Sequence, residues 1–221
     1  MSGLLILFSS EIERSAAFPD GDPPGVGVAI CGVGLVDAAV GAAREIDRVD
    51  PDSVLFAGTC GAHRGATLRI GEILLVSEAG LSSGDVARGE MRIPALLPST
   101  IAIDAAANER LARSIDTSDS LPTVRCSCTL GVTESDALAD LLEHSHGADV
   151  ENLELFAVLR AAGPRPALAL LGVTNIVGSG GGTDWRRNYA EVMGAIGVVL
   201  RVGIERGTGF FSPNVYMKES Q

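Results

Sequence analysis

The sequence predicts a single α/β domain built on a central, mixed but mostly parallel sheet with helices on both faces. The chain has 221 residues, 46% of them hydrophobic and 20% charged, which is enough for one domain with a full core. Continuous apolar runs such as residues 4–8 are typical of strands covered on both faces. These runs alternate with segments of helical apolar spacing, which favours parallel strands joined by right-handed crossovers.

The first half of the chain is expected to supply four strands and one clearly patterned helix. Aliphatic runs predict the strands at residues 4–8, 26–31, 53–57 and 71–76. The helix follows Gly32-Val33-Gly34 and ends at Asp50-Pro51. Its predicted buried face carries Val36, Ala39, Val40, Ala43 and Ile46. Residues 80–100 are weakly patterned and predict a loop on the substrate side.

The second half is predicted to add two strands and four helices. Asp104 can cap a helix that runs to about Ser114, and Thr133 can cap the next one, at residues 134–143. Strands are expected at residues 123–130 and 167–173, and the other helices at 151–162 and 185–205. From Gly207 the sequence is polar and aperiodic, so we expect a domain over residues 1–206 and a tail over 207–221.

Charge and composition exclude several classes of partner. The formal net charge of −11 argues against nucleic acid or an anionic membrane surface, because both require basic patches. No apolar stretch reaches the roughly 20 residues that cross a bilayer, so no membrane partner is expected. The glycine segments lack dinucleotide and P-loop signatures, and no Cys or His cluster completes a metal site, so neither cofactor nor metal is expected.

The cysteines predict the compartment of the protein. Cys31, Cys60, Cys126 and Cys128 all lie in apolar, strand-like contexts. No secretory leader precedes them. We therefore expect reduced core thiols in a cytoplasmic protein.

Unusual residues collect at the predicted carboxyl ends of the strands, where ligands bind in folds of this kind. Glu13 follows the first strand, Glu154 lies in the first turn of a predicted helix, and Asn175 follows the strand at 167–173. Taken singly, Glu13 fits an exposed loop or first-turn acid, Glu154 a partner of the helix dipole and Asn175 a turn former. Their shared position at one sheet edge favours a functional interpretation.

Two separated acids and one amide match what cleavage of a purine N-glycosidic bond requires. The transition state resembles an oxocarbenium ion, which a carboxylate on the ribose hydroxyls favours. A second carboxylate can position or deprotonate a water molecule. The base leaves more easily when its N7 accepts a proton or a strong hydrogen bond.

Four segments, by their order and spacing, resemble the nucleoside phosphorylase/nucleosidase superfamily over most of the chain. Three of them are Ser9 to Glu13, similar to the acidic N-terminal loop of hydrolytic members; Gly32-Val33-Gly34; and Ala57-Gly58-Thr59-Cys60-Gly61-Ala62 with residues 68–73. The fourth is Val150-Glu151-Asn152-Leu153-Glu154, in which Leu153 replaces the usual Met. The resemblance implies a nucleoside phosphorylase-like fold and a homo-oligomer, a dimer or higher.

The pair Thr174-Asn175 distinguishes between classes of enzyme within that superfamily. Methylthioadenosine/adenosylhomocysteine nucleosidases carry Ser-Asp there, and a neutral amide suits a 6-oxopurine. Futalosine hydrolases resemble the chain more closely, because Asn175-Ile176-Val177-Gly178 and Trp185 keep their Ser-Asn-x-Val-Gly…Trp spacing. Gly180-Gly181 stands where those hydrolases carry Arg-Asp, so the resemblance implies that this chain would lack a polar contact to the distal group of futalosine.

The resemblance implies a role for each matching residue. Glu13 would position water, Glu154 would grip the ribose, and Asn175 would contact the purine. The implied substrate-binding residues are Thr59, Cys60, Gly61, Asn152, Leu153 and Thr174.

Two alternatives to a hydrolase stay open. In the resembling phosphorylases an Arg binds phosphate three residues before the Ser of the Gly-Ser segment, and this chain has Phe56 there. Because the acids of its first loop would also repel phosphate, we expect water as the nucleophile. The second alternative is a catalytically silent relative that binds a nucleoside, which Leu153 and the missing Arg-Asp pair would fit.

Overall fold

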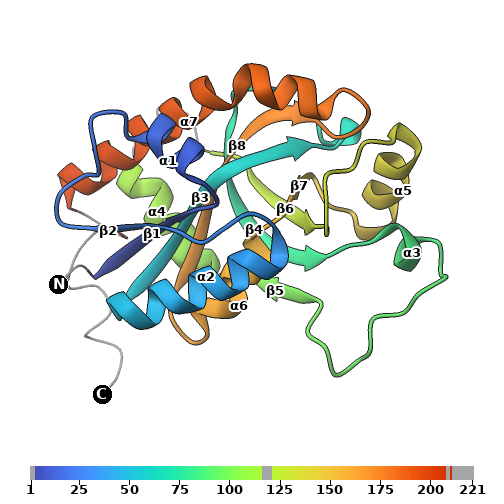
Figure 1. Cartoon of the computed structure of the whole chain (residues 1–221), viewed down its shortest axis with the longest axis horizontal. Coiled ribbons are helices and arrows are strands. Elements are labelled where there is room, and N and C mark those ends of the chain that lie inside the picture. Colours follow the sequence, from blue (N-terminus) through green and yellow to red (C-terminus); the bar gives the residue numbers. More distant parts are fainter. Residues whose placement is uncertain (1–2, 116–120, 208–209, 211–221) are drawn as a thin grey trace.

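The computed structural model describes residues 3–115, 121–207 and 210, and it has the predicted α/β architecture (Figure 1). Its elements, in chain order, are β1 (Leu4–Phe8), α1 (Glu11–Ala17), β2 (Gly27–Ile30), α2 (Gly34–Val49), β3 (Ser53–Ala62), the 3-10 helix η1 (Arg64–Ala66), β4 (Ile73–Leu81), α3 (Gly84–Ala87), β5 (Thr100–Ala102), α4 (Ala105–Ile115), β6 (Thr123–Cys128), α5 (Asp136–His146), β7 (Val150–Asn152), α6 (Leu155–Ala162), β8 (Ala167–Ile176) and α7 (Gly181–Arg206).

The strands form one eight-stranded mixed sheet in the order β2-β1-β3-β7-β6-β4-β5, and β8 pairs with both β3 and β4. The pairs β1–β2, β1–β3, β3–β8, β4–β6 and β6–β7 are parallel. The pairs β3–β7, β4–β5 and β4–β8 are antiparallel. The prediction of a mixed, mostly parallel sheet is therefore confirmed.

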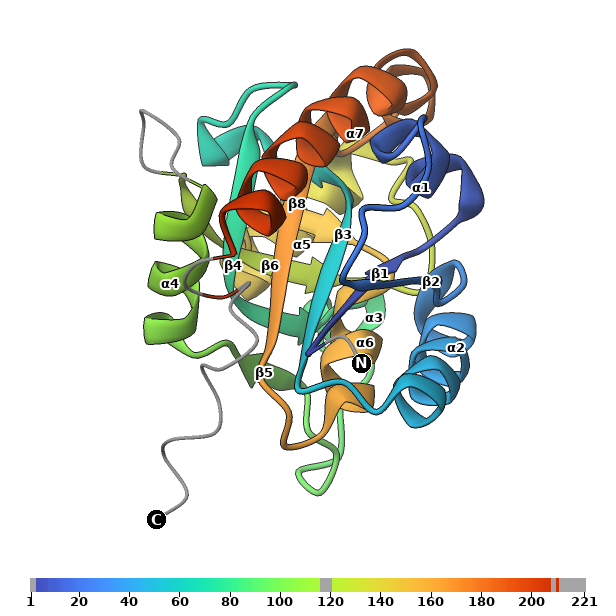
Figure 2. The ribbon, with the colours of Figure 1, turned by 90° about the vertical axis from the view of Figure 1, so that its left-hand side faces the viewer.

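Helices cover the sheet on both faces (Figure 2). The helix α7 packs on β8 and beside α1, whereas α2 packs beside α6. The core strands are continuous apolar runs, and Leu5, Ile6, Leu7 and Phe8 have no exposed side-chain surface. Such strands are buried because the helices on the two faces exclude water from both sides.

The helix α1 was not predicted, and it carries Glu13 into the molecule. Ser10 caps it by accepting a hydrogen bond from the Glu13 backbone N–H at 3.4 Å. The helix then packs closely on α7. A Cβ atom at Gly197 would lie 1.9 Å from the carbonyl oxygen of Ala17, so only glycine permits this approach. Glu13 is consequently a buried acid in the first turn of α1 rather than an exposed one.

The predicted buried face of α2 is partly wrong. Val36, Val40 and Ala43 are exposed, with Val36 at 71% exposure, whereas Ala38, Ala42 and Ile46 are buried. The reason is a close approach to the end of β2: a Cβ at Gly41 would lie 1.9 Å from the Cys31 carbonyl oxygen. The small residues Ala38 and Ala42 therefore face the core, whereas Val36 and Val40 face outward.

Three predicted element boundaries near the sheet edge are wrong. Residues 58–62 continue β3 instead of forming a loop, because they pair with β8, which itself runs on to Ile176. Residues 150–152 form the strand β7, and the predicted helix at 151–162 begins only at Leu155. The predicted cap Thr133 bonds Glu151 instead, and Ser135 caps α5 by accepting from the Leu138 N–H at 3.3 Å.

Other boundaries shift as well: the strand predicted at residues 71–76 is β4, which runs on to Leu81. The segment at residues 80–100, expected to be a loop, holds the short helix α3 and the start of β5. The final helix starts at Gly181, four residues before the predicted 185. Asp104 caps α4 as predicted, with its Oδ1 accepting from the Ala107 N–H at 2.6 Å.

The cysteines and one described residue of the predicted tail, Phe210, are buried. All four cysteines are buried free thiols. In the described part of the chain, no helix is long and apolar enough to cross a membrane. Of the predicted tail, Gly207 and Phe210 are described, and Phe210 is buried with its N–H donating to Ser114 Oγ at 3.1 Å. Residues 208–209 and 211–221 lie outside the described residues.

Candidate active site

Glu13 lies in α1, at the end of β1, and its carboxylate accepts hydrogen bonds from two neighbouring segments. Its Oε1 accepts from the backbone N–H of Thr59 at 3.1 Å and from Thr59 Oγ1 at 2.7 Å. Its Oε2 accepts from Ser9 Oγ at 2.5 Å. The side chain is only 3% exposed. Such donors stabilise an ionised carboxylate in a buried place.

Thr59, in the middle of β3, connects this acid to α7. Its Oγ1 donates to Glu13 and also accepts the indole N–H of Trp185 at 3.1 Å. The Trp185 ring in turn stacks on Tyr189, with ring centroids 4.8 Å apart. In the sequence Trp185 stood out only by its spacing from Asn175.

Glu154 is held by the first turn of another helix. Its Oε1 accepts from the backbone N–H of Gly34, the first residue of α2, at 2.8 Å. A helix N-terminus favours a negative charge at this point. Gly34 has a φ of +81°, a conformation that favours glycine and explains the second glycine of Gly32-Val33-Gly34.

Asn152 aligns Glu154 from the end of β7. Its Oδ1 accepts from the backbone N–H groups of Glu154, at 2.8 Å, and Leu155, at 2.7 Å, and so caps α6. Its Nδ2 donates to Glu154 Oε2 at 3.1 Å and to the Thr59 carbonyl oxygen at 3.0 Å. Glu154 is therefore the residue before α6, not part of its first turn as predicted. The Asn152 amide thus connects Glu154 to Thr59, whose backbone N–H donates to Glu13.

The electrostatic environment of Glu154 shifts its pKa. Burial raises the pKa of Glu154 to about 7, and the charge of Glu13 adds to that rise, while the bonds from Gly34 and Asn152 oppose it. Burial, followed by the charges of Glu154 and Glu13, raises the pKa of the Cys31 thiol to about 12. Cys31 is thus a neutral neighbour of both carboxylates.

Asn175 lies on β8, where it pairs with Gly61 of β3 just after a β-bulge. A Cβ at Gly61 would lie 2.8 Å from Asn175 Nδ2, so the glycine leaves room for the amide. The amide oxygen accepts from Thr174 Oγ1 at 2.9 Å, and Nδ2 makes a long, 3.4 Å contact with the Ile176 carbonyl. The side chain is only partly buried.

The remaining predicted substrate-binding residues divide into two groups. Thr59, Gly61 and Asn152 lie among the functional groups described above, and Leu153 is half-buried between Asn152 and Glu154. Cys60 and Thr174 are buried, and Thr174 Oγ1 contacts the Cys60 carbonyl oxygen at 3.2 Å. Those two residues support the strands. No group of three His, Cys, Asp or Glu residues in the described segments can hold a metal ion.

Sequence reasoning missed Ser9, Cys31 and Glu151. Glu151, on β7, is buried; its Oε1 accepts from the Thr133 N–H at 3.1 Å and its Oε2 from Thr133 Oγ1 at 2.5 Å. Burial raises its pKa. The only available signal was its place in the segment from Val150 to Glu154.

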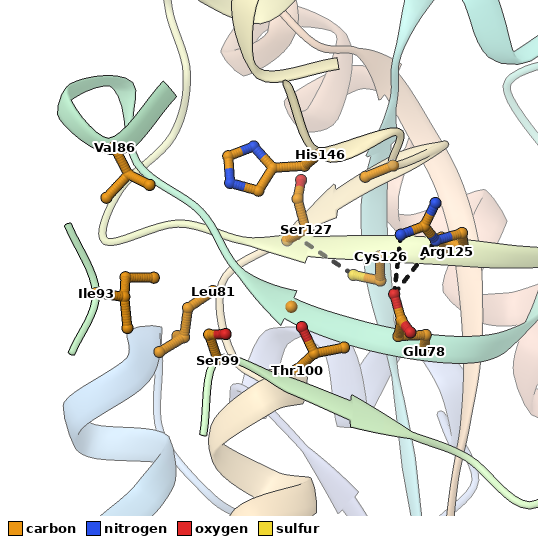
Figure 3. Close-up of a pocket in the computed structure, with 12 residues that line it drawn as sticks. Glu78, Leu81, Val86, Ile93, Ser99, Thr100, Arg125, Cys126, Ser127 and His146 are labelled. Carbon is orange, nitrogen blue, oxygen red and sulfur yellow. Dashed lines mark hydrogen bonds and ion pairs between the residues drawn. The ribbon is translucent and has the colours of Figure 1, made fainter. Parts of the chain in front are cut away.

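An open cavity of about 300 Å³ lies elsewhere, against β4, β6 and the end of α5 (Figure 3). Ser127 and His146 line one side of it, and Arg125 is paired with Glu78 at 3.0 Å. None of the predicted site residues lines this cavity. The candidate site is therefore built on the two acids.

Comparisons with known proteins agree with this fold. A family model described as "Phosphorylase superfamily" matches residues 24–199. No curated protein matches the chain at a significant level. A futalosine hydrolase mutant of Helicobacter pylori is 12% identical, with a TM-score of 0.80, over 93% of this chain and 99% of that chain.

Two nucleosidases are similar to the same extent. The 5′-methylthioadenosine/S-adenosylhomocysteine nucleosidase from Colwellia psychrerythraea, in complex with adenine, is 16% identical with a TM-score of 0.78, over 93% of this chain and 96% of that chain. The 5′-methylthioadenosine/S-adenosylhomocysteine nucleosidase from Helicobacter pylori, with butyl-thio-DADMe-Immucillin-A, is 14% identical. Its TM-score is 0.79, over 93% of this chain and 98% of that chain. At these identities the likeness is one of fold.

Proposed function

The chain belongs to the phosphorylase superfamily, and on that premise we propose that it hydrolyses the N-glycosidic bond of a purine nucleoside and releases the free base. The observation that carries the proposal is the pair of buried acids, Glu13 and Glu154. Asn152 and Thr59 join them in one hydrogen-bonded network at a single sheet edge.

The two acids divide the chemistry. Ionised Glu154 holds the ribose hydroxyls and favours the positive charge that develops on the sugar as the bond to the base breaks. Glu13 holds the attacking water and takes its proton as the bond from the water oxygen to the anomeric carbon forms. The electron pair of the broken bond leaves with the base, whose N7 accepts a hydrogen bond from the Asn175 amide, and a proton from solvent completes the neutral free base.

Water is favoured over phosphate by charge. A phosphate nucleophile needs cationic fork donors, whereas Glu13 and Glu154 place negative charge at the nucleophile. Phe56, at the position of the phosphorylase arginine, is fully buried. A phosphate-dependent phosphorylase and a silent nucleoside-binding protein are the competing candidates.

Asn175 directs the substrate prediction. A neutral amide suits a 6-oxopurine, so inosine-like or futalosine-like nucleosides are the preferred class. We also propose a cytoplasmic homo-oligomer. The outward Val36 and Val40 of α2 support an interface between copies, because exposed apolar stripes are commonly covered in assemblies.

Base release, followed by chromatography, tests the function. Inosine, futalosine, adenosine and methylthioadenosine are each incubated with the protein, with and without phosphate. Release without phosphate is expected, fastest with a 6-oxopurine nucleoside, and Glu154→Gln is expected to abolish it while the circular dichroism spectrum is unchanged. Release only with phosphate would establish a phosphorylase, and thermal stabilisation by nucleoside without any release would establish a silent binder.

A further inference from the structure

We propose that Trp185 is a positioning residue, which fixes the hydroxyl of Thr59 so that its proton points at Glu13. The inference rests on the proposed function, because it assigns Glu13 the role of holding water. It starts from a chain of two short contacts that crosses from α7 to β3 and on to α1. Trp185 Nε1 lies 3.1 Å from Thr59 Oγ1, which lies 2.7 Å from Glu13 Oε1.

The direction of both hydrogen bonds follows from the chemistry of the groups. An indole N–H only donates, and an ionised carboxylate only accepts. The hydroxyl of Thr59 has a single proton. Since Trp185 occupies an acceptor position on that oxygen, the proton is left for Glu13, and the donation by Trp185 strengthens the bond to the carboxylate.

The indole is itself held in place. It stacks on Tyr189, one turn further along α7, with an interplanar angle of 18°. The same helix packs on β8 and against α1, which carries Glu13. Trp185 thus acts from a rigid element, and a fixed ring gives the hydroxyl a fixed orientation.

Thr59 also connects the two acids through hydrogen bonds of its backbone. Its backbone N–H donates to Glu13, and its carbonyl oxygen accepts from Asn152, which holds Glu154. Loss of the indole N–H would free the hydroxyl to rotate away from Glu13 while leaving the Glu154 side intact. The expected defect therefore lies in the chemical step rather than in nucleoside binding.

Kinetics of Trp185→Phe test the proposal, because phenylalanine keeps an aromatic ring beside Tyr189 and removes the indole N–H donor. We expect kcat to fall about two- to tenfold, the range of one hydrogen bond, with KM nearly unchanged. Arg187→Gln, an exposed change on the same helix, is the control and should leave kcat unchanged. In Thr59→Val the further change Trp185→Phe should have no additional effect, because the acceptor is already absent. An unchanged kcat in Trp185→Phe, or additive losses, would overturn the proposal.

A second readout does not depend on turnover. Trp185 is the single tryptophan of the chain, so its indole N–H gives one resonance in a ¹⁵N-labelled sample. Thr59→Val should shift this resonance and speed its exchange with solvent, and Thr59→Ser should restore both. An indole resonance that Thr59→Val leaves unchanged would refute the contact between Trp185 and Thr59. If the wild type released no base, the proposed function would fail, and the indole resonance alone would decide whether Trp185 holds Thr59.

Discussion

At the scale of single residues, Glu13 and Glu154 are both buried acids, but they are held differently. Glu13 accepts from three donors, whereas Glu154 accepts from the Gly34 N–H and from Asn152, which also orders the backbone around it. Burial of a carboxylate disfavours its charged form, and a like charge nearby disfavours it further. The environment of Glu154 thus places its titration near neutral pH.

A residue-level prediction concerns the titration of Glu154. With a carbon-13 label on the carboxyl groups, NMR should find its pKa near 7 in the wild type. Glu13→Gln removes the neighbouring charge and should lower that pKa, because the Glu13 carboxylate raises it. An identical titration in both proteins would show that the two acids do not interact.

The same titration predicts how activity depends on pH. The ionised form of Glu154 is the one that favours a positive charge on the sugar. On the acidic limb of the profile, kcat/KM should therefore rise with pH up to about 7 and then level off. A pH–rate profile measures it. An acidic limb that ends near pH 4.5, the ordinary range of Glu, would contradict the burial of the active carboxylate.

At the scale of elements, α1 is placed by α7. The close approach at Gly197 seats α1 so that Glu13 reaches Thr59 in β3. The short strand β7 has a similar role for the other acid, because it ends at Asn152, whose side chain caps α6 and turns Glu154 toward α2. The positions of both acids therefore depend on packing between elements.

Two glycines of α7 test that dependence. Gly197→Ala should destabilise the fold by about 1–3 kcal/mol, because the added methyl meets the Ala17 carbonyl oxygen. Gly194→Ala is the matched control: its Cβ would lie an ordinary 3.8 Å from the nearest atom, so alanine should stabilise the helix by roughly 0.5–1 kcal/mol. Urea denaturation compares the two, and equal effects would disprove the close approach.

At the scale of the whole molecule, the buried acids Glu154 and Glu151 reduce stability where they are ionised. The folded-state pKa of Glu154, about 7, exceeds the ordinary value of 4.5, so the folded protein binds more protons between these limits. The contribution of Glu154 to the free energy of unfolding should therefore fall as pH rises from about 4.5 to 7. The raised pKa of Glu151 acts in the same direction.

Unfolding measured against pH checks this prediction. Glu154→Gln should be more stable than the wild type at pH 8, by at most about 3 kcal/mol, and close to it at pH 4.5. Glu109→Gln, at an exposed acid, is the control and should keep the slope of the wild type. A stability difference between Glu154→Gln and the wild type that stays constant across this range would mean that Glu154 is not penalised by burial.

Several features were predictable, because a short run of residues specifies each of them. They are the strands at residues 4–8 and 53–57, the Asp104 cap and the Gly32-Val33-Gly34 turn. Glu13, Glu154 and Asn175 were chosen as candidate site residues because they stand next to recognisable segments. The exposed valines of α2 were not predictable. Periodicity finds two apolar faces there, and only the contact at Gly41 decides which one is buried.

By itself, the sequence determined the fold class, the alternation of its elements and the residues at the sheet edge, because local propensity and hydrophobic period act over a few neighbours. Only the tertiary structure decided that residues 150–152 are a strand, that Asn152 joins the two acids, and that Trp185 meets Thr59. These contacts join positions about 90 to 130 residues apart. They depend on strand register and helix packing, which no local pattern specifies.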